Sequence, residues 1–267
     1  MRDRDVYIMS GARTAIGDFG GALKDFLGHQ LAVFPMEEAL KRAQVGKEMV
    51  EEVILGHCIQ RTDEPNTART AALKMGIPAS VPAFTVQRQC SSAMQAVVSG
   101  AQMIQLGEAD IVLAGGVETM SSAPYVIKTA RWGQRLQHGQ MSDTVWEVLT
   151  DPLTGMLMGM ATEGLAEKYK ITREEQDEVS YRSHKNAARA IAEGKFKEEI
   201  VPVLIPQRKG APKVFETDEH PRKDISMEEL AKLNPAFKKG GTVTAGNSSG
   251  LNDGASAVVL MSGAKVQ

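Results

Sequence analysis

The sequence has few cysteines, few aromatic residues and no long apolar run. Only Cys58 and Cys90 occur among 267 residues, which excludes a disulfide framework and fits a reducing compartment. No segment approaches the roughly 20 apolar residues of a membrane helix, and the N-terminal MRDRDVYIMSGARTA lacks the apolar core of a secretory signal. The formal net charge of −2 gives no sign of nucleic-acid binding. We therefore expect a soluble, cytoplasmic protein that binds neither nucleic acid nor membrane.

Strand and helix signals alternate over residues 1–120, which is typical of an α/β layer fold. The apolar run that ends at Gly115-Gly116 shows no alternation, as in a sheet covered on both faces. The expected strands are Val6–Met9, Val53–Ile59, Phe84–Gln89 and Asp110–Ala114, and the expected helices are Leu31–Ala43, Thr67–Met75 and one that follows Cys90.

The middle of the chain has a different sequence pattern from residues 1–120. The apolar residues of 119–157 have weak periodicity, which indicates a long segment packed on the main layer. Helices are expected at Thr162–Tyr169 and Glu174–Glu193, the second after a Thr172/Glu175 capping box. A strand at Ile200–Ile205, a loop at 207–224, a turn at Asn252–Gly254 and a strand at Ala257–Met261 complete the expected order.

Cys90 stands between an expected strand and an expected helix. The apolar positions Met94, Val97, Val98, Ala101 and Ile104 predict one buried helix face. A thiol at a helix start lies near unpaired N–H groups and the positive end of the helix dipole, and both favour the thiolate. Cys90 is thus a candidate nucleophile, while a small buried hydrophobe is the other interpretation of a free cysteine.

The residues around Cys90 resemble the nucleophile region of thiolases, the acetyl-CoA C-acetyltransferase and 3-ketoacyl-CoA thiolase family. The resemblance covers nearly the whole chain in four ordered motifs. These are SGARTAIGDFGGALKD (10–25), VQRQCSSAMQAVVSGAQMIQLGEADIVLAGGVETMSSAPY (86–125), MGMATEGLAEKYKITREEQD (158–177) and LNPAFKKGGTVTAGNSSGLNDGASAVVLMS (233–262).

The resemblance implies an α/β fold, a βαβαβαββ layer with a mixed sheet and an inserted loop domain. Residues 1–119 and 250–267 are expected to form the N-terminal α/β domain, and residues 120–249 the CoA-contacting loop domain. The chain ends where a thiolase would be about two-thirds complete, so the C-terminal twin domain is expected to be absent.

The resemblance also implies roles for single residues. Cys90 matches the acyl-accepting nucleophile, and its own N–H matches one oxyanion donor. The family's Asn-Glu-Ala-Phe segment, its Gly-His-Pro segment and its second cysteine do not occur here. The motif Gly56-His57-Cys58 is interpreted as a core strand segment. His29, His138, His184 and His220 are interpreted as structural or solvent-facing.

Further residues match family positions that contact CoA or the acyl group. Leu149, Met158 and Phe237 match the acyl and pantetheine pocket, and apolar side chains there could equally be core. Arg222 matches a position near the CoA nucleotide. The set of predicted substrate residues is Leu149, Met158, Arg222, Phe237, Ala245 and Ser249. No metal-ligand cluster occurs in the sequence, so no cofactor is expected beyond CoA thioesters as substrates.

The sequence therefore predicts an acyltransferase that moves an acetyl or acyl group between CoA thioesters through Cys90, by Claisen condensation or thiolysis. Leu157 stands where short-chain biosynthetic thiolases commonly have His, which leaves room for longer acyl chains. One alternative is a non-catalytic half-thiolase that binds acyl-CoA or pairs with a separate C-terminal partner. Another is a ketoacyl synthase, against which the GNSSGLNDG signature argues. A homo-oligomer is expected in either thiolase case, because surfaces normally covered would be exposed.

Overall fold

The computed structural model describes residues 3–136 and 138–266. The chain divides into two compact units. The first comprises the described residues of Met1–Ser122, Glu198–Glu219 and Asn252–Gln267, and the second comprises those of Ala123–Lys197 and His220–Leu251. The domain boundaries expected from the sequence differ from this division mainly in residues 198–219, which cluster with the first unit.

The first unit is built on a mixed sheet with the strand order β1-β10-β5-β3-β4, in which β2 also pairs with β10. The β3 strand runs parallel to both β4 and β5, whereas β10 is antiparallel to β1, β2 and β5. The strands are β1 (Val6–Arg13), β2 (Gly17–Asp18), β3 (Glu52–Gly56), β4 (Ala83–Val86), β5 (Ile111–Thr119) and β10 (Asn252–Ser262). The expected mixed-sheet α/β fold is confirmed.

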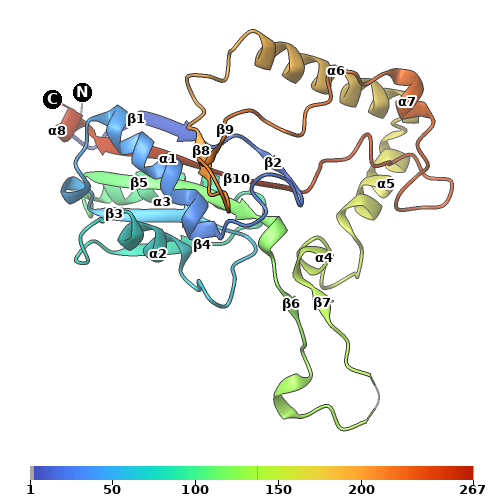
Figure 1. The fold of residues 1–267 in the computed structure, drawn as a ribbon, viewed down its shortest axis with the longest axis horizontal. Coiled ribbons are helices and arrows are strands. Elements are labelled where there is room, and N and C mark those ends of the chain that lie inside the picture. The colour runs from blue at the N-terminus through green and yellow to red at the C-terminus, as the bar shows by residue number, and fades with distance from the viewer. Residues whose placement is uncertain (1–2, 137, 267) are drawn as a thin grey trace. The chain divides into compact units, whose positions relative to one another are not determined.

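Helices cover both faces of this sheet (Figure 1). Alternate residues of each strand point to opposite faces, so Val53 and Leu55 pack with α1 and α2, whereas Ile54 packs with α3. The unit's helices are α1 (Gly28–Ala43), η1 (Lys47–Met49), α2 (Thr67–Lys74), α3 (Ser92–Leu106), η2 (Met120–Ser122) and α8 (Gly263–Val266). The hairpin of β8 (Val203–Ile205) and β9 (Lys213–Phe215) also belongs to this unit.

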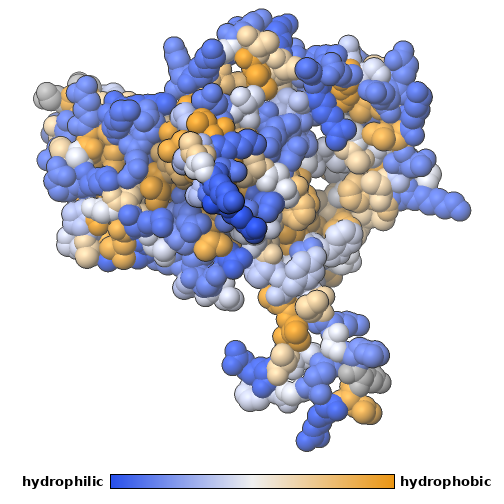
Figure 2. Space-filling view, in the orientation of Figure 1, coloured by the Kyte–Doolittle hydropathy of each residue, from blue (hydrophilic) through white to orange (hydrophobic). Residues whose placement is uncertain are grey.

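The second unit is mainly helical. It contains β6 (Tyr125–Val126), η3 (Ala130–Trp132), β7 (Ser142–Asp143), α4 (Thr144–Val148), α5 (Met158–Tyr169), α6 (Arg173–Ala192) and α7 (Met227–Ala231). The predicted capping box of α6 is confirmed, because Thr172 N donates to Glu175 (2.8 Å) and Glu175 N donates to Thr172 Oγ1 (3.2 Å). Figure 2 shows apolar side chains along the hairpin of β6 and β7, where Tyr125, Ile127 and Met141 are exposed.

Several strand boundaries differ from the prediction. The β1 strand continues to Arg13, β4 ends at Val86 and β8 begins at Val203. The β5 strand continues through Gly115-Gly116 to Thr119, because both glycines lie in its ladder with β10. The residues Asn252–Gly254 are not a turn but the start of β10. The β3 strand ends at Gly56, so Cys58 lies beyond it. The β9 strand and the α7 helix were missed by the sequence patterns.

The predicted buried face of α3 is wrong. Met94 is 66% exposed and Val98 is 40% exposed, and of the predicted positions only Ile104 is buried. The buried positions are Ser92, Ala96, Gly100 and Ile104. Small residues at Ser92, Ala96 and Gly100 let the helix approach the sheet closely, whereas Met94 and Val98 lie on its exposed side. Among the described residues, no helix has both the length and the apolar composition needed to cross a membrane.

Candidate active site

Cys90 lies in the short turn between β4 and α3, and its side chain is exposed. The main chain of this turn is closed by Ser91 N, which donates to the carbonyl of Arg88 (3.1 Å). The hydroxyl of Ser92 donates to the carbonyl of Gln89 (2.6 Å) and accepts from Arg88 N (2.8 Å). Cys90 therefore lies two residues before Ser92, the first residue of a 15-residue helix.

The start of α3 rests directly on the sheet, and two glycines make this possible. A Cβ atom on Gly56 would overlap the backbone of Ser92 and Ala93, and one on Gly116 would overlap the Cβ of Ala93. These glycines belong to the parallel neighbours β3 and β5 and are register partners. The absence of both side chains thus determines how closely the cysteine turn is seated on the sheet.

Cys58, the second cysteine, is part of the same region of the first unit. Its Sγ donates to Oε1 of Gln89 (3.1 Å) and its N–H donates to Glu118 (3.0 Å). Burial, together with the nearby Glu118 carboxylate and Cys90, raises the pKa of the Cys58 thiol to about 11. Cys58 is therefore a neutral thiol near pH 7, whereas Cys90 is the exposed one.

The histidines of the first unit have structural partners. His57 is 1% exposed and its Nδ1 lies 2.8 Å from Thr67 Oγ1, so its interpretation as core is confirmed, although it lies one residue beyond β3. The Nδ1 of His29 lies 2.5 Å from the buried carboxylate of Glu64, which also accepts from the first two N–H groups of α1. Neither histidine forms a hydrogen bond with Cys90.

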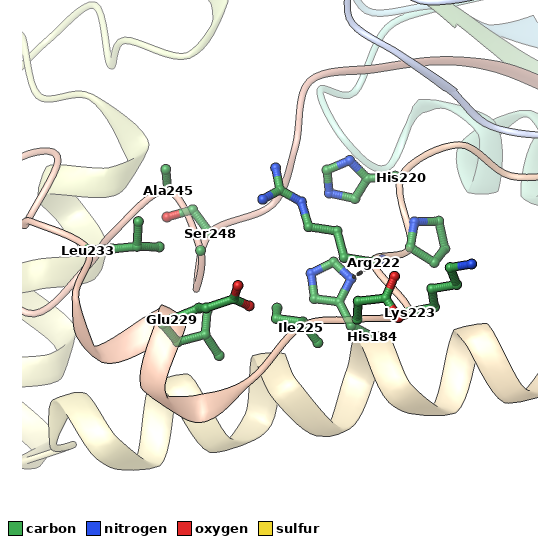
Figure 3. A pocket seen from close by; sticks show the side chains of 13 residues that line it. His184, His220, Arg222, Lys223, Ile225, Glu229, Leu233, Ala245 and Ser248 are labelled. Atoms are coloured by element: carbon green, nitrogen blue, oxygen red, sulfur yellow. Dashed lines mark hydrogen bonds between the residues drawn. The ribbon is translucent and has the colours of Figure 1, made fainter.

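The second unit contains a pocket of about 590 Å³. Its lining comes from α6, α7, the 220–225 segment and the 245–248 loop (Figure 3). His184, His220 and Arg222 lie at one side of it, and Leu233, Ala245 and Ser248 lie at the other. The lining thus combines cationic and ring groups, the carboxylates of Asp224 and Glu229, and small and apolar residues, a composition that suits an extended ligand with a charged end.

Hydrogen bonds from α6 hold the cationic side of the pocket. Arg222 N donates to Nδ1 of His184 (3.1 Å), and Lys185 Nζ donates to the carbonyl of Lys223 (2.8 Å). The rings of His184 and His220 are 5.9 Å apart. Burial, His220 and Arg222 together lower the pKa of His184. The imidazole of His184 is therefore neutral and accepts the hydrogen bond from Arg222 N.

The opposite wall is formed by the loop after residue 243, which is held by buried polar groups. Asn247 donates to Asp177 (2.8 Å) and accepts from Thr244 N (2.7 Å). The hydroxyl of Ser180 donates to the carbonyl of Gly246 (2.5 Å). Because Asp177 is only 2% exposed, this loop is fixed to α6 rather than free in solvent.

Of the predicted substrate residues, Arg222 and Ala245 line this pocket. Leu149 and Met158 are brought together elsewhere in the unit, since Met158 N donates to the carbonyl of Leu149 (3.0 Å). The ring of Phe237 lies against the α carbon of Gly159, the residue after Met158. Ser249 is exposed, and its hydroxyl donates to the carbonyl of Gly250 (3.3 Å).

Sequence reasoning missed several lining residues. His184 and His220, interpreted as structural or solvent-facing, both line the pocket together with Lys223 and Ser248. His220 and Lys223 lie next to Arg222 in sequence, and that proximity could have indicated them. His184 comes from α6 and only the tertiary structure brings it to the site. Among the described residues, no group of three or more His, Cys, Asp or Glu side chains could hold a metal ion.

Cys90 lies at a strand–helix junction of a mixed α/β sheet. Proteins of this class have a candidate nucleophile at that junction. The family model "Thiolase, N-terminal domain" matches residues 6–264. The chain belongs to the thiolase family. It spans about two thirds of the length of the curated relatives it matches.

Similar proteins carry thiolase names. The chain is 49% identical over 262 residues to an acetyl-CoA acetyltransferase of Syntrophomonas wolfei, covering 97% of this chain and 66% of the relative. A solved Bacillus anthracis acetyl-CoA acetyltransferase is 58% identical, with a TM-score of 0.96 over 98% of this chain and 66% of that one. The human mitochondrial 3-ketoacyl-CoA thiolase in complex with CoA is 40% identical, with a TM-score of 0.93 over 98% and 65%.

Proposed function

We propose that this chain supplies the nucleophile and the CoA-binding part of an acyltransferase that acts on CoA thioesters. In this proposal the Cys90 thiolate attacks the acyl carbonyl carbon, a new C–S bond forms, and CoA leaves as its thiolate. Either CoA or an acetyl-CoA carbanion then takes the acyl group, giving thiolysis or Claisen condensation. The observation that carries the proposal is the exposed Cys90 at the start of α3, together with the family membership.

Binding roles follow from the second unit. Arg222 and the neighbouring Lys223 are proposed to bind the phosphates of CoA, because both cations line one pocket. Ala245 and Ser249 are proposed to lie along the pantetheine arm, where small residues allow close approach. Leu149, Met158 and Phe237 are proposed to line the acyl site. Residues 120–249 would thus act as the CoA-contacting domain, and no cofactor besides the CoA thioesters is invoked.

The acylation step is tested by mass spectrometry. Incubation of the protein that carries this sequence with acetyl-CoA is expected to acetylate the peptide that contains Cys90, and Cys90→Ala is expected to abolish that label. In a limiting iodoacetamide titration of the folded chain, Cys90 should react before Cys58. A thiol of pKa about 11 is only about 0.1% thiolate at pH 8. Equal rates at the two cysteines would contradict the assignment.

The binding roles are tested by calorimetry with CoA. Arg222→Ala is expected to weaken binding by about tenfold or more, the usual loss of a charged hydrogen bond to phosphate. Arg182→Ala is the matched control, because Arg182 is exposed on the same helix as His184 but does not line the pocket. Equal affinity of both variants would argue against a CoA phosphate at Arg222.

A second candidate function is acyl-CoA binding without turnover. It is favoured by one observation, that His29 and His57 of the same unit form hydrogen bonds with Glu64 and Thr67 rather than with Cys90. A thiolate without a general base typically loses several orders of magnitude in rate. We expect a polypeptide of these 267 residues to thiolyse acetoacetyl-CoA negligibly while it still binds CoA. Turnover within tenfold of an intact thiolase would exclude this reading.

We further propose a cytoplasmic location, since both cysteines are free thiols. We also propose a homo-oligomer, in which β4, one of the two edge strands of the sheet, lies at the contact between copies. Exposed apolar residues of β4 and α3 support this proposal.

A further inference from the structure

Gln89, the residue directly before Cys90, has a backbone conformation that ordinary residues avoid. Its φ is +50°, and the left-handed region costs an L-residue roughly 1–2 kcal/mol. The other described non-glycine residues with positive φ are Gln44 and Lys170, which both cap helix C-termini, where this conformation is common. Gln89 precedes a helix instead. The strain at Gln89 therefore requires a local interaction that compensates for it.

Part of this compensation comes from the turn itself. Ser92 N and Ser92 Oγ both donate to the carbonyl of Gln89, at 3.0 and 2.6 Å. These bonds fix the main chain of Gln89 on one side only. The side chain of Gln89 is held from another element, because its Oε1 accepts from Cys58 Sγ at 3.1 Å. This bond joins residues 31 apart in sequence.

Cys58 is in turn held firmly. The carboxylate of Glu118, on β5, accepts from Cys58 N (3.0 Å) and from Ile59 N (3.2 Å). Two backbone donors on one carboxylate fix the loop that follows β3. The raised pKa of the Cys58 thiol keeps its proton in place near neutral pH. Cys58 is therefore a permanent donor at a fixed position, not a competing nucleophile.

We propose that Cys58 is a positioning residue for Cys90. The hydrogen bond that the Cys58 thiol donates to Gln89 holds the strained turn that presents the Cys90 thiol at the start of α3. The proposal rests on the proposed role of Cys90 as nucleophile. When the bond is lost, Gln89 relaxes toward negative φ and Cys90 moves away from the helix N–H groups. The exposed thiol is then no longer held in one position before α3.

Cys58→Ser and Cys58→Ala form the matched pair that tests the role. Both remove the second thiol, so all iodoacetamide label reports on Cys90, but only Ser keeps a donor toward Gln89. The rate of Cys90 labelling is measured from pH 6 to pH 10 by peptide mass spectrometry. With Ser, the rate should stay within twofold of the parent across this pH range. With Ala, labelling at pH 7 should slow about fivefold, as expected for one lost hydrogen bond.

A second background separates positioning from a general loss of structure. Glycine adopts positive φ without strain, so in the Gln89→Gly background Cys58→Ala should leave the Cys90 profile unchanged. If the shorter serine fails to reach Gln89, both Cys58 variants should be slow in the parent and equal in the glycine background, which also supports the proposal.

The proposal is overturned if Cys58→Ala leaves the parent profile unchanged. It is equally overturned if Cys58→Ala slows labelling as much in the Gln89→Gly background as in the parent. The proposed function fails by a different outcome, the absence of Cys90 acetylation by acetyl-CoA. The two failures are therefore distinguishable.

Discussion

At the scale of single residues, the candidate site depends on glycines, which have no side chain, as much as on the side chains around Cys90. Gly56 and Gly116 leave the space that the start of α3 occupies, and an added methyl at either position would overlap the backbone or side chain of Ala93. Positions without side chains cannot adapt by changing rotamer. The seat of Cys90 is therefore sensitive to the smallest substitution.

Gly56→Ala is expected to destabilise the protein by more than about 1 kcal/mol, the typical cost of overpacking, and to slow Cys90 labelling. Gly164→Ala is the control, because Gly164 lies within α5 with nothing near its hypothetical Cβ. That change should stabilise the helix by about 0.5–1 kcal/mol. Chemical denaturation and iodoacetamide rates measure both effects. A Gly56→Ala protein with parental stability and reactivity would show that α3 shifts at no cost.

His184 makes the second unit sensitive to pH. Its folded-state pKa lies below the ordinary value of 6.5 because of burial and the neighbouring His220 and Arg222. The unfolded chain therefore binds more protons, and the stability contributed by neutral His184 is complete above pH 6.5 and is lost as pH falls through the folded pKa.

His184→Gln is expected to flatten this pH dependence, since an amide oxygen can accept from Arg222 N without titrating. The free energy of unfolding of the parent should fall between pH 7 and pH 5 more steeply than that of the variant. His138→Gln, at an exposed position, should keep the parental slope. Parallel curves for parent and His184→Gln would refute the role.

At the scale of elements, one buried carboxylate joins α5 to the loop that leads into the pocket wall. Glu163 is 4% exposed and accepts from Thr242 N (2.9 Å), Thr242 Oγ1 (3.2 Å) and Val243 N (2.8 Å). Burial alone would raise the pKa of Glu163, but these donors outweigh it and the net direction is downward. The carboxylate thus remains ionised and orders residues 241–243.

Glu163→Gln places an amide N–H against these backbone donors, so we expect a loss of about 1–3 kcal/mol and weaker CoA binding. Glu167→Gln is matched in chemistry and lies one turn further along α5, but the side chain of Glu167 is 75% exposed and pairs with Lys238. It should change stability by less than about 0.5 kcal/mol. Denaturation midpoints and CoA calorimetry measure both variants. Equal effects of the two changes would contradict the role given to the buried Glu163 carboxylate.

At the scale of the whole molecule, apolar surface remains uncovered on the first unit. Phe84 on the edge strand β4 is 39% exposed, and on α3 Met94 is 66% and Leu106 is 75% exposed. An edge strand flanked by apolar side chains is a ready surface for pairing with a second copy.

The double variant Phe84→Asp/Met94→Asp is expected to shift the protein toward monomer, because charges are costly to bury in a contact. Leu153→Asp is the control, since Leu153 is 94% exposed on the second unit. Light scattering across micromolar concentrations measures the effect. A parent that is monomeric throughout would contradict the proposed oligomer.

The sequence alone determined the α/β class, the main strands and helices of the first unit and the candidate nucleophile, through local signals such as apolar runs and the position of Cys90 before a helix. The mixed sheet and the family followed from the resemblance of four motifs to thiolases. Strand ends were less predictable: Gly115 and Gly116 resemble a stop, yet they lie within β5 because their ladder with β10 continues. Pairing with a distant strand is not encoded in the local pattern.

Only the tertiary structure decided which face of α3 is buried, which residues line the pocket and what holds Cys90. The period of apolar residues favoured Met94, but the start of α3 is seated on Gly56 and Gly116 through Ser92 and Ala93, and Gly100 lies against Val112 and Leu260, so small residues face the sheet instead. His184 reaches the pocket and Cys58 reaches Gln89 through contacts between residues more than 30 apart in sequence. Such contacts depend on how whole elements pack, and local spacing contains no information about them.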